Sequence, residues 1–164
     1  MPIWSDADLA AAVADGSFGV EPWLPDDLTP NGLDLRIGEV LVPGHHDDHA
    51  VTEGTVVVPP MSRFLVGTEQ VVAMPAAACG QLWLRSSYAR RGVLASFGKV
   101  EAGFAGNLTL AAFNSAAEPL EIPVGDRFCQ LILEDLRSAP AEGYEARSGT
   151  YQHQRGVTLA KDRA

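Results

Sequence analysis

Short apolar runs rich in β-branched residues recur along the chain, separated by glycines and prolines roughly every eight to twelve residues. This spacing is typical of a β-sandwich or barrel. An α/β fold would show strands alternating with long helices, and the sequence does not have that pattern. The pattern predicts strands over residues 33–37, 55–58, 63–66, 70–74, 81–84, 107–113, 120–123 and 128–133. We therefore expect an all-β fold.

One amphipathic helix is predicted near the N-terminus. Ser5 is a suitable N-cap, Asp6 and Asp8 place acidic groups in the first turn, and Gly16 ends the apolar stripe. A further helical turn is predicted over 86–91. The expected architecture is thus a β-barrel or sandwich with a short N-terminal helix and one or two helical turns.

The length of 164 residues suits a single domain spanning 1–164. Segment 138–149 is rich in Ala, Glu, Gly and Ser and predicts a loop, whereas 151–161 regains aromatic, amide and basic residues. We interpret 138–164 as a C-terminal arm that closes over the active site. Simple fraying of the chain end is the alternative.

The net charge of −9 argues against nucleic acid as a partner, because a duplex-binding protein needs a basic face. The negative net charge does not exclude a small phosphorylated ligand, since a few arginines in one cleft can outweigh the average negative potential of the protein. The N-terminus lacks the pattern of a signal peptide, and no apolar run is long enough to span a membrane. We expect a cytoplasmic protein.

The cysteines, the histidine-rich run and the tryptophans of this sequence suit structural roles. Cys79 and Cys129 lie among apolar or small neighbours and are predicted to be buried thiols. Residues 45–49 read His-His-Asp-Asp-His, which could ligate Zn or Ni, but a solvated loop is the favoured interpretation. The tryptophans are expected in the core or at an interface; they are Trp4, Trp23 and Trp83.

Residues 85–92, Arg-Ser-Ser-Tyr-Ala-Arg-Arg-Gly, concentrate groups that suit an anion. Serine hydroxyls and free backbone N–H groups at a helix start can donate to phosphate oxygens, and arginines add bidentate, charge-assisted bonds. A solvated turn with ordinary surface arginines is the alternative.

This stretch resembles the phosphate motif of dCTP deaminases and their dUTPase relatives. Further segments resemble that family in the same order: 29–38 (Thr-Pro-Asn-Gly-Leu-Asp-Leu-Arg-Ile-Gly), 100–106 followed by 108–114, 125–131 and 151–154. Together they identify the chain as a member of the dCTP deaminase/dUTPase family. The short segment 94–99 is similar to that of a compact archaeal-type subgroup.

The resemblance implies a dUTPase-like homotrimer with sites at subunit interfaces, and dUTP or dCTP as the partner. Mg²⁺ would be carried by the triphosphate, with no metal ligand from the chain. By resemblance, the phosphates contact Arg85, Ser86, Ser87 and Arg90. Glu101 stands near the sugar 3′-hydroxyl and the catalytic water, and Phe104 against the deoxyribose. Tyr144 and Gln154 come from the closing arm. The catalytic set would be Glu101, Arg90 and Ser86.

Two departures bear on the activity. Family deaminases carry a Glu in a strand of pattern Leu-Glu-x-x-Asn, but this chain has Ala111 at that position. Loss of a general acid–base group typically costs about 10²–10⁴-fold in rate. Glu101 replaces the usual Asp, which lengthens the side chain by one methylene. We therefore predict a dUTP diphosphatase, which forms dUMP and pyrophosphate. The alternatives are dCTP deamination with a substitute base and a non-catalytic nucleotide-binding regulator.

Overall fold

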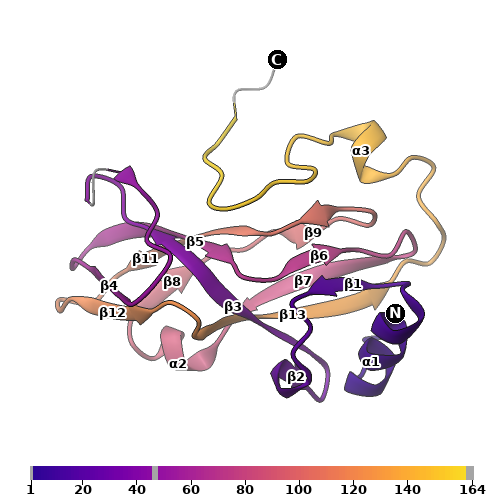
Figure 1. The fold of residues 1–164 in the computed structure, drawn as a ribbon, viewed down its shortest axis with the longest axis horizontal. Helices are drawn as coiled ribbons and strands as arrows, with labels where there is room; N and C mark the ends of the chain where they lie inside the picture. The colour runs from indigo at the N-terminus through magenta and orange to yellow at the C-terminus, as the bar shows by residue number, and fades with distance from the viewer. Residues whose placement is uncertain (1, 46–47, 162–164) are drawn as a thin grey trace.

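A computed structural model describes residues 2–45 and 48–161 and confirms the all-β prediction (Figure 1). Its largest sheet is antiparallel and has the order β8-β11-β5-β3-β13-β7-β9, with β2 paired to β3. The bounds are β8 (Val93–Ala95), β11 (Thr109–Asn114), β5 (Ser62–Thr68), β3 (Gly32–Leu41), β13 (Arg127–Asp135), β7 (Ala78–Leu84), β9 (Lys99–Val100) and β2 (Leu28–Thr29).

Two smaller sheets complete the β structure. One has the order β1-β6-β10 and the other pairs β12 with β4; their bounds are β1 (Gly19–Glu21), β6 (Val71–Ala73), β10 (Ala105–Gly106), β12 (Leu120–Pro123) and β4 (Thr55–Val58). Buried and exposed positions alternate along β4 and β12, as expected for strands with one face on the core. Every predicted strand is present. The pattern missed β1, β2, β8, β9 and β10, which are too short to show a period of two.

The N-terminal helix is confirmed as α1 (Asp6–Asp15), with Ser5 as N-cap in a capping box with Asp8 and Gly16 in the left-handed conformation at its end. The predicted turn over 86–91 forms α2 (Ser86–Ala89). The remaining short helices are η1 (Pro25–Asp27) and α3 (Tyr144–Arg147). The prediction of a loop over 138–149 therefore missed one helical turn.

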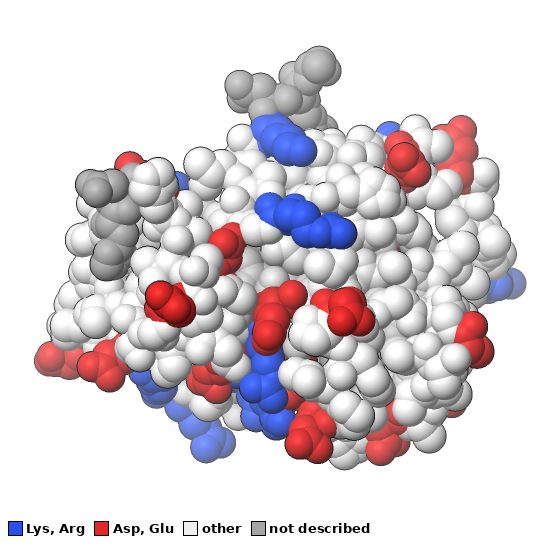
Figure 2. All heavy atoms as spheres, in the orientation of Figure 1, with Lys and Arg blue, Asp and Glu red and all other residues white. Residues whose placement is uncertain are grey.

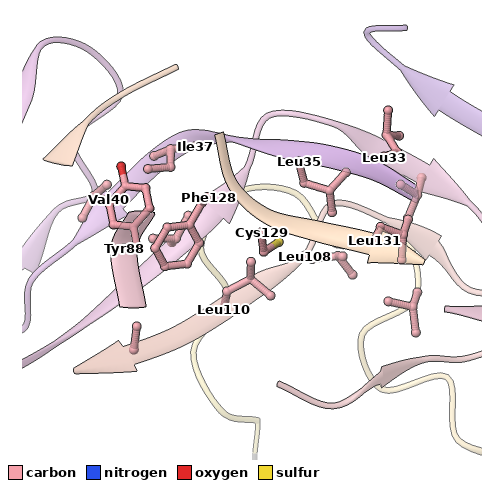
Figure 3. Close-up of a cluster of buried hydrophobic side chains, with 14 of the residues drawn as sticks. Leu33, Leu35, Ile37, Val40, Tyr88, Leu108, Leu110, Phe128, Cys129 and Leu131 are labelled. Atoms are coloured by element: carbon pink, nitrogen blue, oxygen red, sulfur yellow. The ribbon is translucent and has the colours of Figure 1, made fainter. Parts of the chain in front are cut away.

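The core lies between the curled strands and holds α2 in place (Figure 3). Phe128 of β13 packs edge-on against Tyr88 of α2, with ring centroids 5.0 Å apart. The Tyr88 hydroxyl donates to the Asp126 carboxylate at 2.9 Å. Burial, followed by this hydrogen bond, raises the pKa of Tyr88, so the phenol stays a neutral donor. Tyr88 thus fixes the helix that carries the arginine- and serine-rich motif.

A buried ion cluster joins η1 to the central strands. The Asp27 carboxylate is fully buried and accepts from Arg36 Nη2 at 2.6 Å and from Arg127 Nε at 2.8 Å. The hydrogen bond from Arg36 to Asp27 raises the pKa of the guanidinium, against an opposing effect of burial. The two ion pairs of Asp27 therefore tie η1 to β3 and β13.

The cysteine prediction is confirmed, since Cys79 and Cys129 are free and buried. Burial raises the pKa of Cys129 to about 12, which makes it an inert thiol. Trp4 packs on the core and donates to Asp135 at 2.7 Å, and Trp23 also packs there. Trp83 is 58% exposed, so an interface role for it stays a prediction. None of the helices in 2–45 and 48–161 has the length and hydropathy to cross a membrane.

Candidate active site

A cavity of about 680 Å³ opens on one face of the β5–β11 pair. The register sets Leu65 opposite Ala111 and Arg63 opposite Phe113. Because alternate residues of a strand share a face, Arg63 and Leu65 line the same floor as Ala111 and Thr109. The exposed Ala111 confirms that β11 presents no carboxylate to this cavity.

A tight turn after β9 places the predicted acid and aromatic residues at the cavity wall. The Phe104 N–H donates to the Glu101 carbonyl oxygen at 3.1 Å, and Gly103 between them has φ of 79°, a conformation that favours glycine. Glu101 is exposed and Phe104 is buried. Among the described lining residues, Glu101 supplies the sole carboxylate.

Residues of the C-terminal arm, drawn in yellow in Figure 1, line this cavity from the same chain. Tyr144 packs edge-on against Phe104 with ring centroids 5.6 Å apart. The Gln152 amide brackets the turn, since it accepts from the Ala105 N–H at 3.0 Å and donates to the Gly103 carbonyl at 3.1 Å. Tyr144 and Gln154 therefore meet Glu101 and Phe104 around one cavity.

The Gln154 side chain is hydrogen-bonded to the backbone of the same chain. Its Nε2 donates to the Asn107 carbonyl at 2.6 Å, and the Asn107 N–H donates to the Gln154 carbonyl at 3.3 Å. A phosphate contact by Gln154 would replace the side-chain bond, so this role stays a prediction.

The arginine- and serine-rich motif lies away from this cavity within one chain. None of Arg85, Ser86, Ser87 and Arg90 lines it, and α2 lies at the opposite edge of the molecule from α3 in Figure 1. Ser86, Ser87 and Arg90 are exposed, whereas Arg85 forms an ion pair with the buried Asp34 of β3. The single chain thus brings Glu101, Phe104, Tyr144 and Gln154 together and leaves the four motif residues apart.

Several cavity residues were not singled out from the sequence: Arg63, Lys99, Thr109 and Thr158. Arg63 is the most informative, because it is an exposed cation diagonal to Ala111 across the β5–β11 pair. Alternation along β5 could have assigned Arg63 to the face of Leu65. Nothing in the sequence indicated the register between β5 and β11, which places Arg63 near Ala111.

The charged groups form no metal-binding cluster within the described residues, and one face of the molecule carries both signs of charge (Figure 2). No three His, Cys, Asp or Glu side chains among them gather in a way that could hold a metal ion. Acidic and basic residues are interspersed on the face shown in Figure 2. In the 45–49 run, the Asp48 carboxylate accepts the Gly44 N–H at 2.6 Å, while 46–47 lie outside the described residues.

The curled antiparallel fold defines a class that contains both deaminases and dUTPases. The chain is similar to the 2′-deoxycytidine 5′-triphosphate deaminase structure from Agrobacterium tumefaciens, with a TM-score of 0.67 and 22% identity. That match covers 81% of this chain and 48% of the other, so the chain spans about half of that protein's length. It is also similar to the dUTPase of Staphylococcus bacteriophage 80alpha, with a TM-score of 0.54, 18% identity, and coverage of 76% and 94%.

Sequence similarity narrows the class. Residues 3–136 match the family described as dCTP deaminase-like. The dCTP deaminase of Pyrococcus horikoshii is 39% identical, over 87% of this chain and 89% of that protein. The dCTP deaminase of Pyrobaculum islandicum is 37% identical, over 97% and 96%. The chain therefore belongs to the dCTP deaminase-like family, as the five sequence segments indicated.

Proposed function

We propose that this chain removes the exocyclic amino group of dCTP and produces dUTP and ammonia. The observation that carries the proposal is the cavity in which the Glu101 carboxylate lies beside Phe104, under an arm of the same chain. The relatives named dCTP deaminase, at 35–39% identity, support deamination over the dUTP hydrolysis that the sequence analysis preferred. We therefore rank dCTP deamination above dUTP hydrolysis, the opposite of the ranking predicted from the sequence.

In this reaction Glu101 acts as the proton carrier. Its carboxylate takes a proton from water as the oxygen bonds to C4 of cytosine and delivers that proton to N3, so the C4–N3 double bond becomes single. Glu101 then carries the proton of the new C4 hydroxyl to the amino group, so that the bond from C4 to the amino nitrogen breaks, ammonia leaves and the C4 carbonyl of dUTP forms. Glu101 would thus substitute for the Glu that family deaminases carry at the position of Ala111. Mg²⁺ would enter with the triphosphate and neutralise its charge.

A second candidate is hydrolysis of dUTP to dUMP and pyrophosphate. The observation that favours it is Ala111, which is exposed on the cavity floor where a deaminase would place its acid. For this reaction Glu101 would orient water toward the α-phosphorus, and the base would need no proton transfer.

Product analysis with dCTP and dUTP in the presence of Mg²⁺ separates these functions. Ammonia and dUTP from dCTP support deamination, and dUMP with pyrophosphate from dUTP supports the second candidate. Absence of ammonia release from dCTP would refute the main proposal. Tight binding of either nucleotide without any product would favour the non-catalytic regulator.

We expect Ala111→Glu to increase ammonia release from dCTP, by up to about 100-fold, because it adds an acid–base group to the cavity floor. Ala111→Gln is the matched control, since it has nearly the same volume and cannot transfer the proton. Initial rates with dCTP measure the effect. Equal rates in the two variants would show that position 111 does not face the reacting base.

We also propose that a second copy of the chain completes the site in a homotrimer. One observation that supports this is that α2 lies apart from the cavity within one chain. A second is that two large apolar side chains are exposed, Trp83 at 58% and Leu94 at 61%. A second hollow of about 610 Å³ is lined by residues 81–84 and 95–99 and adjoins this surface. Apolar surface of this kind is typical of protein interfaces.

Mixing two inactive variants tests the shared site. Arg90→Ala and Glu101→Gln should each be inactive, whereas co-refolded mixtures should regain up to about a quarter of the wild-type rate through hybrid trimers. The rate of product formation is measured at equal total protein. Lack of any recovery in mixtures whose chains demonstrably exchange would contradict a site formed by two subunits.

A further inference from the structure

The carboxylate of Glu39 lies beneath the C-terminal arm, on the central strand β3. Its Oε1 accepts the backbone N–H of Val157, a residue 118 positions further along the chain. Glu39 is half-buried and pairs in register with Gly67 of β5, the strand that also contributes Arg63 and Leu65 to the cavity floor. The contact therefore links the arm to the sheet that forms the candidate active site.

Two glycines leave the space that this contact occupies. A Cβ on Gly67 would lie 2.9 Å from Glu39 Cγ and 3.3 Å from Val157 Cγ2. Gly156 has φ of 67°, and a Cβ on it would lie 2.7 Å from Glu39 Oε1. Any side chain at either position would push the arm or the carboxylate away.

Hydrogen bonds on both sides extend the anchor. The Gly156 carbonyl accepts from Asn107 Nδ2 at 3.4 Å, and the Thr158 N–H donates to Thr109 Oγ1 at 2.9 Å. Gln154 precedes this segment and Leu159 follows it, and both line the cavity. Fixing the backbone over 156–158 therefore fixes the two cavity-lining residues next to it.

We propose that Glu39 is a positioning residue that holds the arm over the cavity of its own chain before nucleotide binds. It accepts a charge-assisted hydrogen bond from the arm backbone and does not touch the reacting atoms. The effect on catalysis rests on the proposed function, whereas docking of the arm can be measured without any substrate.

Limited trypsin digestion of the full chain without nucleotide tests the docking. We expect Glu39→Ala to accelerate cleavage between Arg155 and Gly156 roughly tenfold, because the bond that closes this segment is lost. Glu39→Gln keeps an oxygen acceptor and should restore most of the protection. The control Glu121→Ala removes an exposed carboxylate from β12 and should leave the cleavage rate unchanged. Wild-type cleavage of Glu39→Ala, at an unchanged melting temperature, would overturn the proposal.

Gly156→Ala tests the same contact from the other side. It should also accelerate cleavage, and the increment should shrink in a Glu39→Ala background because the clash with Oε1 is gone. Fully additive effects would show that the two residues act separately and would overturn the shared anchor. With dCTP, Glu39→Ala should raise KM several-fold more than it lowers kcat. Faster cleavage together with an absence of turnover in the wild type would reject the proposed function and leave the anchor standing.

Discussion

Glu101→Gln is expected to lower kcat about 10²–10⁴-fold on the nucleotide that the wild-type chain converts. The amide fills the same space and cannot take up the proton from water. The described cavity lining holds no other carboxylate, so no neighbour can substitute within the chain. Steady-state rates of ammonia and pyrophosphate release measure the loss.

Nucleotide affinity distinguishes a catalytic role from a binding role. We expect Glu101→Gln to bind dCTP or dUTP within a few-fold of the wild type, because the phosphate contacts do not involve this residue. Glu118→Gln, at an exposed position in the loop before β12, is the matched control and should leave turnover unchanged. Unchanged turnover in Glu101→Gln would remove Glu101 from the mechanism of both candidate reactions.

Asp27→Ala is expected to destabilise the fold by about 3 kcal/mol, because removal of one partner leaves charged groups without compensation. Arg36 and Arg127 both lose their bonds to the buried carboxylate. The two guanidinium side chains are 26% and 33% exposed, so water solvates part of the freed charge and the cost falls at the low end of the range for buried pairs. For a domain of this size the melting temperature should fall by about 6–12 °C.

Urea and thermal unfolding measure this change, with Asp26→Ala as the control. Asp26 is the exposed neighbour in η1, and only its backbone carbonyl meets Arg127, so its side chain can be removed without loss of that bond. Asp26→Ala should leave the unfolding midpoint unchanged. Equal midpoints for Asp27→Ala and the wild type would show that the buried cluster adds no net stability.

Local patterns in the sequence were sufficient for much of the fold. The Ser5 cap and Gly16 stop predicted α1, because a helix end depends on residues within one turn. Short β-branched runs between glycines and prolines predicted the longer strands, since such residues favour strands and Gly and Pro mark the turns between them. The strands β1, β2, β8, β9 and β10 were missed because two or three residues are too few to give such a signal.

Some residues of the candidate site could be assigned from local sequence, and others could not. Glu101 and Phe104 could be assigned to one turn from adjacent residues and from the resemblance to the family. The sequence could not tell that Arg63 lies diagonal to Ala111, because strand register depends on how two strands meet. The phosphate contact of Arg85 stays a prediction, and nothing in the sequence indicated that its guanidinium pairs with Asp34 of β3.

The amino-acid order alone predicted the β-rich class and the N-terminal helix, and it showed the arginine- and serine-rich motif and the alanine at position 111. The tertiary structure decided which of these residues share a cavity and that residues of the C-terminal arm line it from the same chain. The decisive contacts join Asp27 to Arg127 across 100 positions and Glu39 to Val157 across 118. Such contacts form only when the sheet closes, and they leave no periodic trace along the chain.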